Sequence, residues 1–337
     1  MGELLPRDLE PMLGKVAEGI PEGEGWLYEP KWDGFRALVF HDGAGFDLIS
    51  RDGKPLARYL PELEGLLRAA VPEGAVLDGE VVITSDDGLD FDSLLLRIHP
   101  ARSRIELLAS AIPASFVAFD VLAARGRPVL ELPARARREL LEELLRGAPE
   151  MPEARRATQV ALTAQTADPD LARRWFDELE AFGLDGVMCK RADEPYRPGE
   201  RVMLKVKHVR TADCVVAGYR LSKSGDGVGS LLLGLYDDSG VLHYVGHTSS
   251  FKVAERRRLL TELRRYEGGG GFGGGRTPGG PSRWSAGRDT SWAPLEPVKV
   301  VEVSYDKLQG DCFRHATRLL RWRDDRDPRS CTFDQVR

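Results

Sequence analysis

Along the first two hundred residues, apolar positions recur in some stretches every second residue and in others with the spacing of a helix. The two patterns predict short strands mixed with helices. Period-two runs rich in Val, Leu, Phe and Tyr predict strands at 25–31, 35–40, 45–50, 75–83, 114–122, 186–190 and 201–207. Helical periods predict helices at 58–70, 90–98, 133–147 and 168–182. Strands come in runs as well as alternating with helices, which favours an α+β fold with largely antiparallel sheets over a doubly wound parallel sheet.

After residue 208 the pattern changes to an all-β one. Short strands are predicted at 213–220, 229–237, 242–247, 297–305 and 316–323, with one helix at 251–266. Five strands with a helix between the third and the fourth are typical of an OB-type barrel. We therefore expect two domains, 1–208 and 209–337. The low-complexity stretch from Glu267 to Pro281 predicts a flexible surface loop.

Composition narrows the protein class only a little. Of the 337 residues, 42% are hydrophobic, and no apolar run is long enough to span a membrane. The N-terminus lacks a secretory pattern, so we expect a cytoplasmic protein. Four scattered cysteines, at 189, 214, 312 and 331, suggest free thiols that act as small buried hydrophobes. The net charge of −5 argues weakly against a nucleic-acid partner, but local clusters of charge decide that question.

The segment "YEPKWDGFRALVF", residues 28–40, carries charged residues inside a predicted strand. Burying the ammonium group of Lys31 is costly unless it is paired, so its position needs a reason. One interpretation is an edge strand with solvated charges. The other is a nucleophilic lysine, because desolvation and neighbouring cations favour the neutral amine that can attack phosphorus. The short motif alone leaves both interpretations open.

Five further segments place charged or aromatic residues on predicted strands or, for the first segment, just after one. They are "SRDGKP" (50–55), "VLDGEVV" (76–82), "SFVAFDVL" (115–122), "GLDGVMCKR" (183–191) and "VMLKVKH" (202–208). Alternation puts Asp78 and Glu80 on one face of a strand, and Lys205 and Lys207 on one face of another.

In this order, the segments resemble the nucleotidyltransferase motifs of ATP-dependent DNA ligases and of their relatives, the RNA ligases and mRNA capping enzymes. The resemblance runs from Glu29 to Arg326 and is strongest to the short two-domain bacterial ligases, ligase C and the ligase domain of ligase D. The final segment, "FRHATRLLRWRDDRDP", resembles the C-terminal motif of the OB domain. Two positions depart from the family pattern: Asp185 stands where many relatives have Glu, and Arg326 stands where many have Lys.

The resemblance implies a reaction in three steps. Lys31 attacks the α-phosphate of ATP, AMP passes to the 5′-phosphate at a nick in duplex DNA, and the 3′-hydroxyl then displaces AMP and seals the nick. It also implies a hinge near 207–210, which lets the OB domain face ATP in the first step and DNA afterwards.

It further implies roles for the other site residues. Lys205 and Lys207 meet the α-phosphate, Phe119 stacks on adenine, and Arg36 and Arg51 grip the AMP phosphate or the 5′-phosphate. Glu80 holds the ribose hydroxyls or a metal, and Asp185 with Glu80 suits Mg²⁺ or Mn²⁺. We also expect Glu29 to lie near the exocyclic amine of adenine and Asp78 to stabilise a turn. Arg321 and Arg326 are expected to lie on the segment of the OB domain that faces ATP.

We accordingly expect an ATP-dependent DNA ligase active in DNA repair, acting as a monomer on nicked double-stranded DNA, with a primase-polymerase or other repair proteins as partners. Glu29 could instead be a solvated edge charge. An RNA ligase or a GTP-dependent capping enzyme shares the motifs, and a non-catalytic DNA clamp is a third reading, although such a clamp would not need Lys31, Glu80, Lys205 and Lys207.

Overall fold

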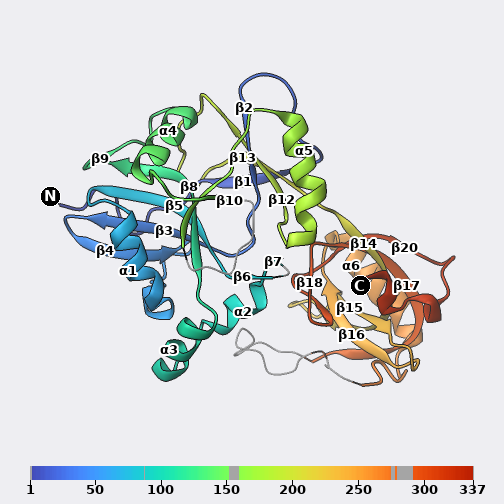
Figure 1. Ribbon diagram of the computed structural model, residues 1–337. Helices are drawn as coiled ribbons and strands as arrows, with labels where there is room; N and C mark the ends of the chain where they lie inside the picture. The colour runs from blue at the N-terminus through green and yellow to red at the C-terminus, as the bar shows by residue number, and fades with distance from the viewer. Residues whose placement is uncertain (1, 87, 152–158, 275–277, 279–290, 337) are drawn as a thin grey trace. The chain divides into compact units, whose positions relative to one another are not determined.

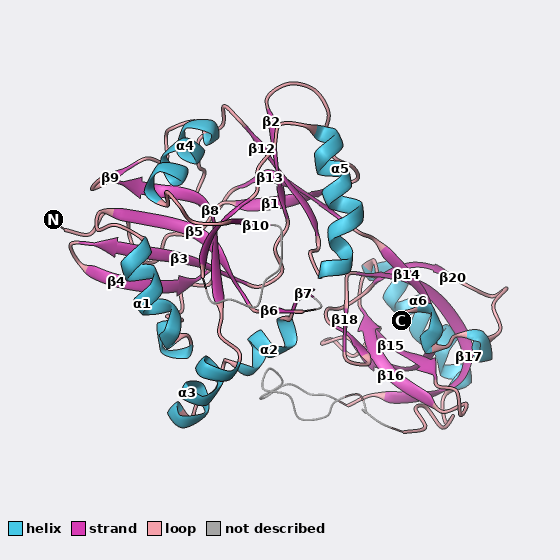
Figure 2. Ribbon diagram, viewed as in Figure 1, coloured by secondary structure: helices cyan, strands magenta, loops and turns pink. Residues whose placement is uncertain are grey.

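The computed structural model describes residues 2–86, 88–151, 159–274, 278 and 291–336. Its backbone contacts divide the chain into two compact units, Met1–Lys207 and His208–Arg337 (Figure 1). Strands dominate both units (Figure 2). No helix in the described ranges is long and apolar enough to cross a membrane.

The first unit is an α+β structure. Its strands are β1 (Leu13–Ala17), β2 (Trp26–Pro30), β3 (Phe35–Asp42), β4 (Gly45–Ser50), β5 (Ala75–Val82), β6 (Thr84–Ser85), β7 (Gly88–Leu89), β8 (Ser115–Ala124), β9 (Arg127–Pro128), β10 (Glu150–Met151), β11 (Val160–Thr163), β12 (Gly186–Arg191) and β13 (Arg201–Lys207). Its helices are α1 (Pro61–Ala70), α2 (Phe91–Leu96), α3 (Arg102–Ala111), α4 (Ala134–Leu144) and α5 (Pro169–Glu178).

Two main sheets form this unit, and both matter for the site. One has the strand order β10-β11-β8-β5-β3-β4, with β9 attached to β8, and the other has the order β1-β13-β12-β2. Only the β10–β11, β11–β8 and β1–β13 pairs are parallel within these two sheets as described. The expectation of largely antiparallel sheets is thus confirmed. Helix α4 packs on β8, and α5 packs on β2 and β12 (Figure 1).

Local signals explain the helix positions. The Asp168 carboxylate accepts a hydrogen bond from the backbone N–H of Asp170 at the start of α5, Pro169 occupies its first turn, and Gly183 ends the following 3₁₀ turn with φ +85°. The amphipathic helix α1 buries Leu63 and Leu67 against the larger sheet, in the core that also contains Leu77 and Val81 of β5.

The second unit is the expected OB-type barrel. Its main strands are β14 (Arg210–Leu221), β15 (Val228–Tyr236), β16 (Leu242–Thr248), β17 (Ala293–Tyr305) and β20 (Arg318–Trp322), with α6 (Val253–Leu263) between the third and the fourth and a small pair formed by β18 (Leu308–Gln309) and β19 (Cys312–Phe313). The strand order is β16-β15-β14-β17-β20. A parallel bridge from Thr248 to Thr317, just before β20, brings the two outer strands together.

Several elements were not expected from the sequence. They are β1, α3, β11 and the two-residue strands β6, β7, β9, β10, β18 and β19. The stretch from Glu267 is a loop in its described part, as predicted. Gly274 bridges to His243, and the Phe272 ring packs against Tyr244 and Trp292, so this part of the loop contacts the barrel. Residues 275–277 and 279–281 of that stretch lie outside the described ranges. All four cysteines are free and buried, as predicted.

Candidate functional site

Lys31 directly follows β2 and is held against the start of β12 by two backbone hydrogen bonds. Its N–H donates to the carbonyl of Gly186 at 2.9 Å, and its carbonyl accepts from the N–H of Asp185 at 3.0 Å. Gly186 has φ +129°, and a Cβ there would lie 2.0 Å from the Val206 carbonyl oxygen, so only glycine fits. The backbone therefore fixes the lysine beside Asp185.

The Asp185 carboxylate is shared by two lysines. Its Oδ2 lies 2.8 Å from the Lys31 Nζ and 2.7 Å from the Lys207 Nζ. Burial raises the pKa of Asp185, but the two ammonium groups outweigh burial and leave that pKa below its usual value. Burial, Lys207 and Lys31 all lower the pKa of Lys205, which lies two positions before Lys207 on β13. Two ammonium groups thus share one carboxylate with a third lysine close enough to feel their charge, an arrangement that suits a phosphate.

The larger sheet contributes Glu80 and the turn that follows Lys31. The backbone N–H of Gly34 donates to the Glu80 Oε1 at 3.1 Å, and a Cβ at Gly34 would lie 2.1 Å from the Val81 carbonyl oxygen. Burial raises the pKa of Glu80 to about 7, although the positive charges of Lys31 and Arg36 oppose this rise. Glu80 therefore belongs electrostatically to the same site as Lys31.

Arg36 on β3 forms an ion pair with a carboxylate of the neighbouring strand, β5. Its Nε and Nη2 donate to the two oxygens of Asp78 at 3.0 and 2.6 Å, and the hydroxyl of Tyr196 donates to the same carboxylate at 2.7 Å. Burial lowers the pKa of Arg36, but Asp78 more than compensates and raises it. The expectation that Asp78 stabilises a turn is wrong, because Asp78 is fully buried in the middle of β5.

Phe119 lies at an irregularity in β8. The register between β5 and β8 passes from the pair Asp78–Asp120 to the pair Gly79–Ala118, so Phe119 has no partner residue on β5. A bulge of this kind redirects a side chain, and bulges are frequent beside functional sites. The Phe119 ring lies 5.4 Å from the Arg36 Cζ and 5.2 Å from the Lys190 Nζ.

Lys190 is a buried residue of this region whose role could not be predicted from the sequence motifs. Its Nζ lies 3.0 Å from Glu29, donates to the carbonyl of Phe119 at 2.9 Å and lies 3.6 Å from Asp120. Because Glu29 is on β2 and Phe119 on β8, Lys190 joins the two sheets. The available signal was a charged position within the apolar run of β12, the same signal that drew attention to Lys31.

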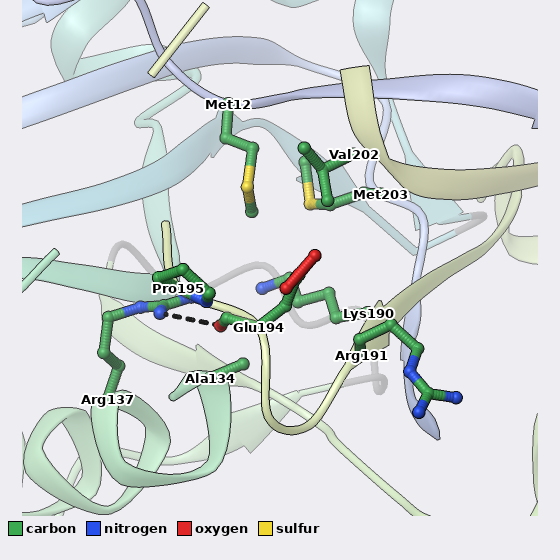
Figure 3. A pocket seen from close by; sticks show the side chains of 9 residues that line it. All are labelled: Met12, Ala134, Arg137, Lys190, Arg191, Glu194, Pro195, Val202 and Met203. Atoms are coloured by element: carbon green, nitrogen blue, oxygen red, sulfur yellow. Dashed lines mark hydrogen bonds between the residues drawn. The ribbon is translucent and has the colours of Figure 1, made fainter. Parts of the chain in front are cut away.

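Glu29 and Asp120 complete a buried network around Lys190. Glu29 is 2% exposed and also accepts a hydrogen bond from the Gln165 Nε2 at 2.7 Å, so the interpretation as a solvated edge charge is wrong. Arg137 on α4 donates to both oxygens of Asp120 at 2.8 and 3.2 Å. Lys190 and Arg137 also line a small pocket that contains none of the predicted site residues (Figure 3); its other lining residues are Met12, Ala134, Arg191, Glu194, Pro195, Val202 and Met203.

The remaining predicted residues lie outside this cluster of contacts. The Arg51 side chain is exposed and pairs with the exposed Asp52 at 3.3 Å. Arg321 and Arg326 belong to the second unit, where Arg321 pairs with Glu302 at 2.5 Å and Arg326 with Asp213 at 3.4 Å.

The carboxylates near Lys31 suit a hard cation. Within the described ranges, no group of three or more His, Cys, Asp or Glu residues could hold a metal ion. The oxygens of Asp185 and Glu80 fit Mg²⁺ even so, because Mg²⁺ commonly binds through one or two carboxylates together with water and substrate phosphates.

Comparisons with known proteins agree with the motif order. A family model described as "ATP dependent DNA ligase domain" matches residues 11–207, and one described as "ATP dependent DNA ligase C terminal region" matches residues 224–326. DNA ligase C1 of Mycolicibacterium smegmatis is 50% identical over 97% of this chain and 93% of the relative. DNA ligase C of Mycobacterium tuberculosis is 47% identical with the same coverage.

More distant similarity supports the same architecture. The multifunctional non-homologous end joining protein LigD of Mycobacterium bovis is 32% identical over 77% of this chain and 32% of its own length. A solved structure from a study of Lig E DNA ligases has a TM-score of 0.58 at 18% identity and covers 93% of this chain and 99% of its own, which shows a shared fold.

Proposed function

Because the chain belongs to the ATP-dependent DNA ligase family, we propose that it seals nicks in duplex DNA through a covalent intermediate in which Lys31 carries AMP. The observation that carries this proposal is the position of Lys31, whose Nζ shares the Asp185 carboxylate with Lys207. A fixed amine beside further cations is what an in-line displacement at phosphorus requires.

In the first step the Nζ of Lys31 forms a bond to the α-phosphorus of ATP. The bond from that phosphorus to the bridging oxygen breaks, pyrophosphate leaves, and the amine proton passes to water. Lys31 must exchange its ion pair with Asp185 for this attack, and Lys207 remains to hold the carboxylate. Lys205 and Lys207 offset the negative charge of the α-phosphate.

The larger sheet would hold the nucleoside. The ring of Phe119 stacks on adenine, and the Glu80 carboxylate accepts hydrogen bonds from the ribose hydroxyls. The Glu29 side chain is engaged by Lys190 and Gln165, so Glu29 meets the base through its backbone. Arg51 can reach a 5′-phosphate because its side chain is exposed. Arg36 lies beside the Phe119 ring and would contact the AMP phosphate from there.

Asp185 and Glu80 would hold Mg²⁺ or Mn²⁺. When bound, such an ion supplies charge neutralisation at the phosphates and orients the leaving group. In the second step an oxygen of the DNA 5′-phosphate takes AMP from Lys31, and in the third the 3′-hydroxyl displaces AMP. The segment with Arg321 and Arg326 faces ATP in the first step only, and the chain near 207–210 is the hinge.

The proposed substrate sets the cellular context. We propose that the protein works where nicked DNA occurs, at the bacterial nucleoid in the cytoplasm. We propose that it acts there as a monomer in repair, beside a primase-polymerase or other repair proteins.

The direct test is sealing of a duplex with one nick and a labelled 5′-phosphate. Sealing should require ATP and a divalent cation, GTP should not replace ATP, and a nicked duplex made only of RNA should be sealed more slowly than DNA. Preference for GTP, or for the RNA duplex, would contradict the assignment and favour a capping enzyme or an RNA ligase.

A further inference from the structure

The second unit contains a cluster of arginines and carboxylates that the proposed function uses only in part. Asp213 on β14 is the register partner of Glu302 on β17, and Glu302 is the register partner of Arg321 on β20. Arg323 and Arg326 follow β20 in the chain. Three neighbouring strands therefore bring two carboxylates beside the arginine-rich segment.

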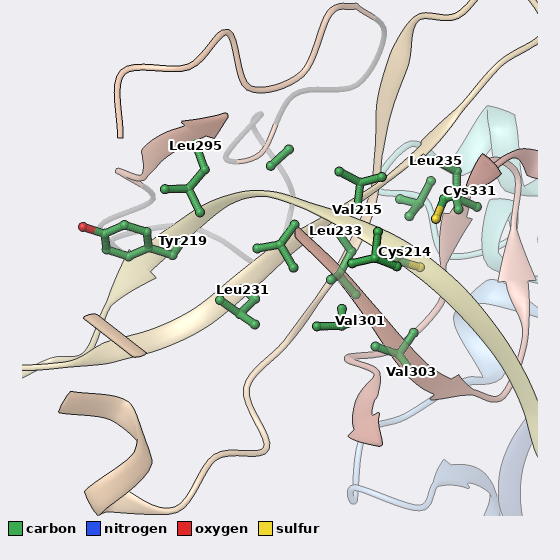
Figure 4. Packing of buried hydrophobic residues seen from close by; sticks show 14 of the residues in the cluster. Cys214, Val215, Tyr219, Leu231, Leu233, Leu235, Leu295, Val301, Val303 and Cys331 are labelled. Carbon is green, nitrogen blue, oxygen red and sulfur yellow. The ribbon is translucent and has the colours of Figure 1, made fainter. Parts of the chain in front are cut away.

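The backbone that presents these carboxylates is anchored in the core. Cys214, next to Asp213, and Val301 and Val303, on either side of Glu302, are buried in the hydrophobic core of the second unit (Figure 4). Alternation along the strands directs Asp213 and Glu302 away from that core. The two carboxylates thus have a rigid support.

Asp213 is the most firmly held member of the cluster. It is 9% exposed, and its two oxygens accept hydrogen bonds from the Arg323 Nη1 at 3.0 and 3.1 Å. Its Oδ2 also lies 3.4 Å from the Arg326 Nε. Gln335 fixes the backbone at this position, since its Oε1 accepts from the Asp213 N–H and its Nε2 donates to the Asp213 carbonyl.

The arginines differ in how many carboxylates hold them. Arg323 is held on two sides, because Asp325 accepts from its Nε and Nη2 at 2.9 and 3.0 Å while Asp213 accepts from its Nη1. Arg321 has a 64% exposed side chain that donates through Nε to Glu302. Its guanidinium makes no other hydrogen bond among the described residues, so its terminal nitrogens point to solvent.

Stability alone gives little reason for such a cluster, because a buried ion pair often contributes no more than apolar residues of the same volume. A fixed carboxylate does, however, set the direction in which a guanidinium fork points. Arg323 is held on both sides and fixes the segment. Arg326 meets Asp213 through its Nε, which leaves its terminal nitrogens for an anionic ligand.

We propose that Asp213 is a positioning residue for the first step of the reaction, and that it holds the segment of Arg323 and Arg326 in the form that meets the triphosphate of ATP. The inference rests on the proposed function. In that step the bond between the α-phosphorus and the bridging oxygen breaks, and the arginines stabilise the charge that develops on pyrophosphate. Joining the 3′-hydroxyl to an already adenylylated 5′-phosphate releases AMP and no pyrophosphate, so it does not need Asp213.

The test compares these two reactions in full-length Asp213→Asn, after pyrophosphate and Mg²⁺ have removed any bound AMP. Transfer of label from α-labelled ATP to the protein should slow by about tenfold or more. Sealing of a pre-adenylylated nick without ATP should stay within about twofold of wild type, because no triphosphate is involved. Asp226→Asn is the matched control. Asp226 is an exposed carboxylate of the same unit that pairs with Arg257 outside the arginine-rich segment, and its loss should change neither rate.

Equal slowing of both reactions, or no slowing of either, would overturn the inference, since a merely structural role affects both. If Asp213→Asn does not fold, Asp213→Glu should show the same split at smaller size, because it keeps the charge and displaces the carboxylate by one methylene. Arg326→Ala distinguishes a failure of the proposed function from a failure of the role given to Asp213. If Arg326→Ala leaves labelling unchanged, the ATP-facing role in the proposed function fails and the inference with it; if it shows the split and Asp213→Asn does not, only the inference fails.

Discussion

The ionisation of Glu80 depends on its burial and on the charged residues of the site around it. Glu80 lies beside Gly34 and is influenced by the charges of Lys31 and Arg36. Burial raises its pKa from 4.5 to about 7, so the folded protein prefers the neutral carboxyl more than the unfolded chain does. The stabilisation that Glu80 contributes is therefore complete below its unfolded pKa and is lost as the pH rises through about 7.

We predict that the ATP-free protein loses stability between about pH 5 and about pH 8, and that Glu80→Gln flattens this dependence because the amide does not ionise. Urea unfolding at several pH values measures it. Glu64→Gln is the control, because Glu64 is exposed in an i,i+4 pair with Arg68. Parallel pH profiles for wild type and Glu80→Gln would contradict the electrostatic account of this residue.

Lys190 is the cation of the buried network that joins the two sheets. Lys190→Met removes the cation shared by Glu29 and Asp120 and leaves a buried charge without compensation, so the free energy of unfolding should fall by about 3–5 kcal/mol. Lys299→Met removes an exposed pair with Asp324 and should cost about 1 kcal/mol or less. Urea unfolding compares the two, and adding Glu29→Gln to Lys190→Met should restore part of the loss. Equal losses for the two lysine variants would show that the buried network is not special.

At the scale of elements, the alternation of residues along single strands was readable from the sequence. It placed Lys205 with Lys207 and Glu80 with Asp78, and the caps of α5 marked where that helix begins. Contacts between strands that are distant in the sequence could not be predicted in this way. The bulge at Phe119 depends on the register of β5 against β8, and the partners of Lys190 come from two distant strands, β2 and β8.

The unexpected elements have the same explanation. β1 is five residues with a glycine and pairs in parallel with β13, which is distant in sequence, so its strand state depends on a tertiary partner. The short run of β11 is also placed by a distant strand, β8. Asp78 was misjudged because its neighbour Gly79 resembles a turn signal; in the structure, a Cβ at Gly79 would lie 2.3 Å from the Phe116 ring, so the glycine is needed for close strand packing.

Gly186 sets how closely the start of β12 approaches β13. Gly186→Ala would bring a Cβ against the Val206 carbonyl at a positive φ, so β12 must shift away from β13 and move Asp185 from Lys31. We expect labelling by ATP to fall by at least about tenfold, since small displacements of reacting groups are costly. Gly65→Ala in α1 meets nothing within 4 Å and should stabilise the protein by up to about 1 kcal/mol without changing the labelling rate. Unchanged labelling in Gly186→Ala would refute this view of the turn.

At the scale of the whole molecule, a net charge of −5 must coexist with DNA binding. Family membership makes DNA the substrate, and cationic side chains must then face its phosphates despite the overall charge. Affinity for nicked duplex should fall linearly with the logarithm of salt concentration, by about a thousandfold between about 50 and 200 mM if six phosphates are neutralised. Fluorescence anisotropy measures this. An intact duplex of the same length should show a similar slope with weaker binding, and affinity that does not change with salt would contradict the expectation.

The central claim is that Lys31 carries AMP. The measurement that tests it most directly is incubation with Mg²⁺ and α-labelled ATP, followed by denaturing electrophoresis, for wild type and Lys31→Ala. We predict a label that remains on the wild-type band, is absent from the variant and is released by nicked DNA. Equal labelling of both proteins, or no labelling of wild-type protein that mass spectrometry shows to be free of AMP, would contradict the account.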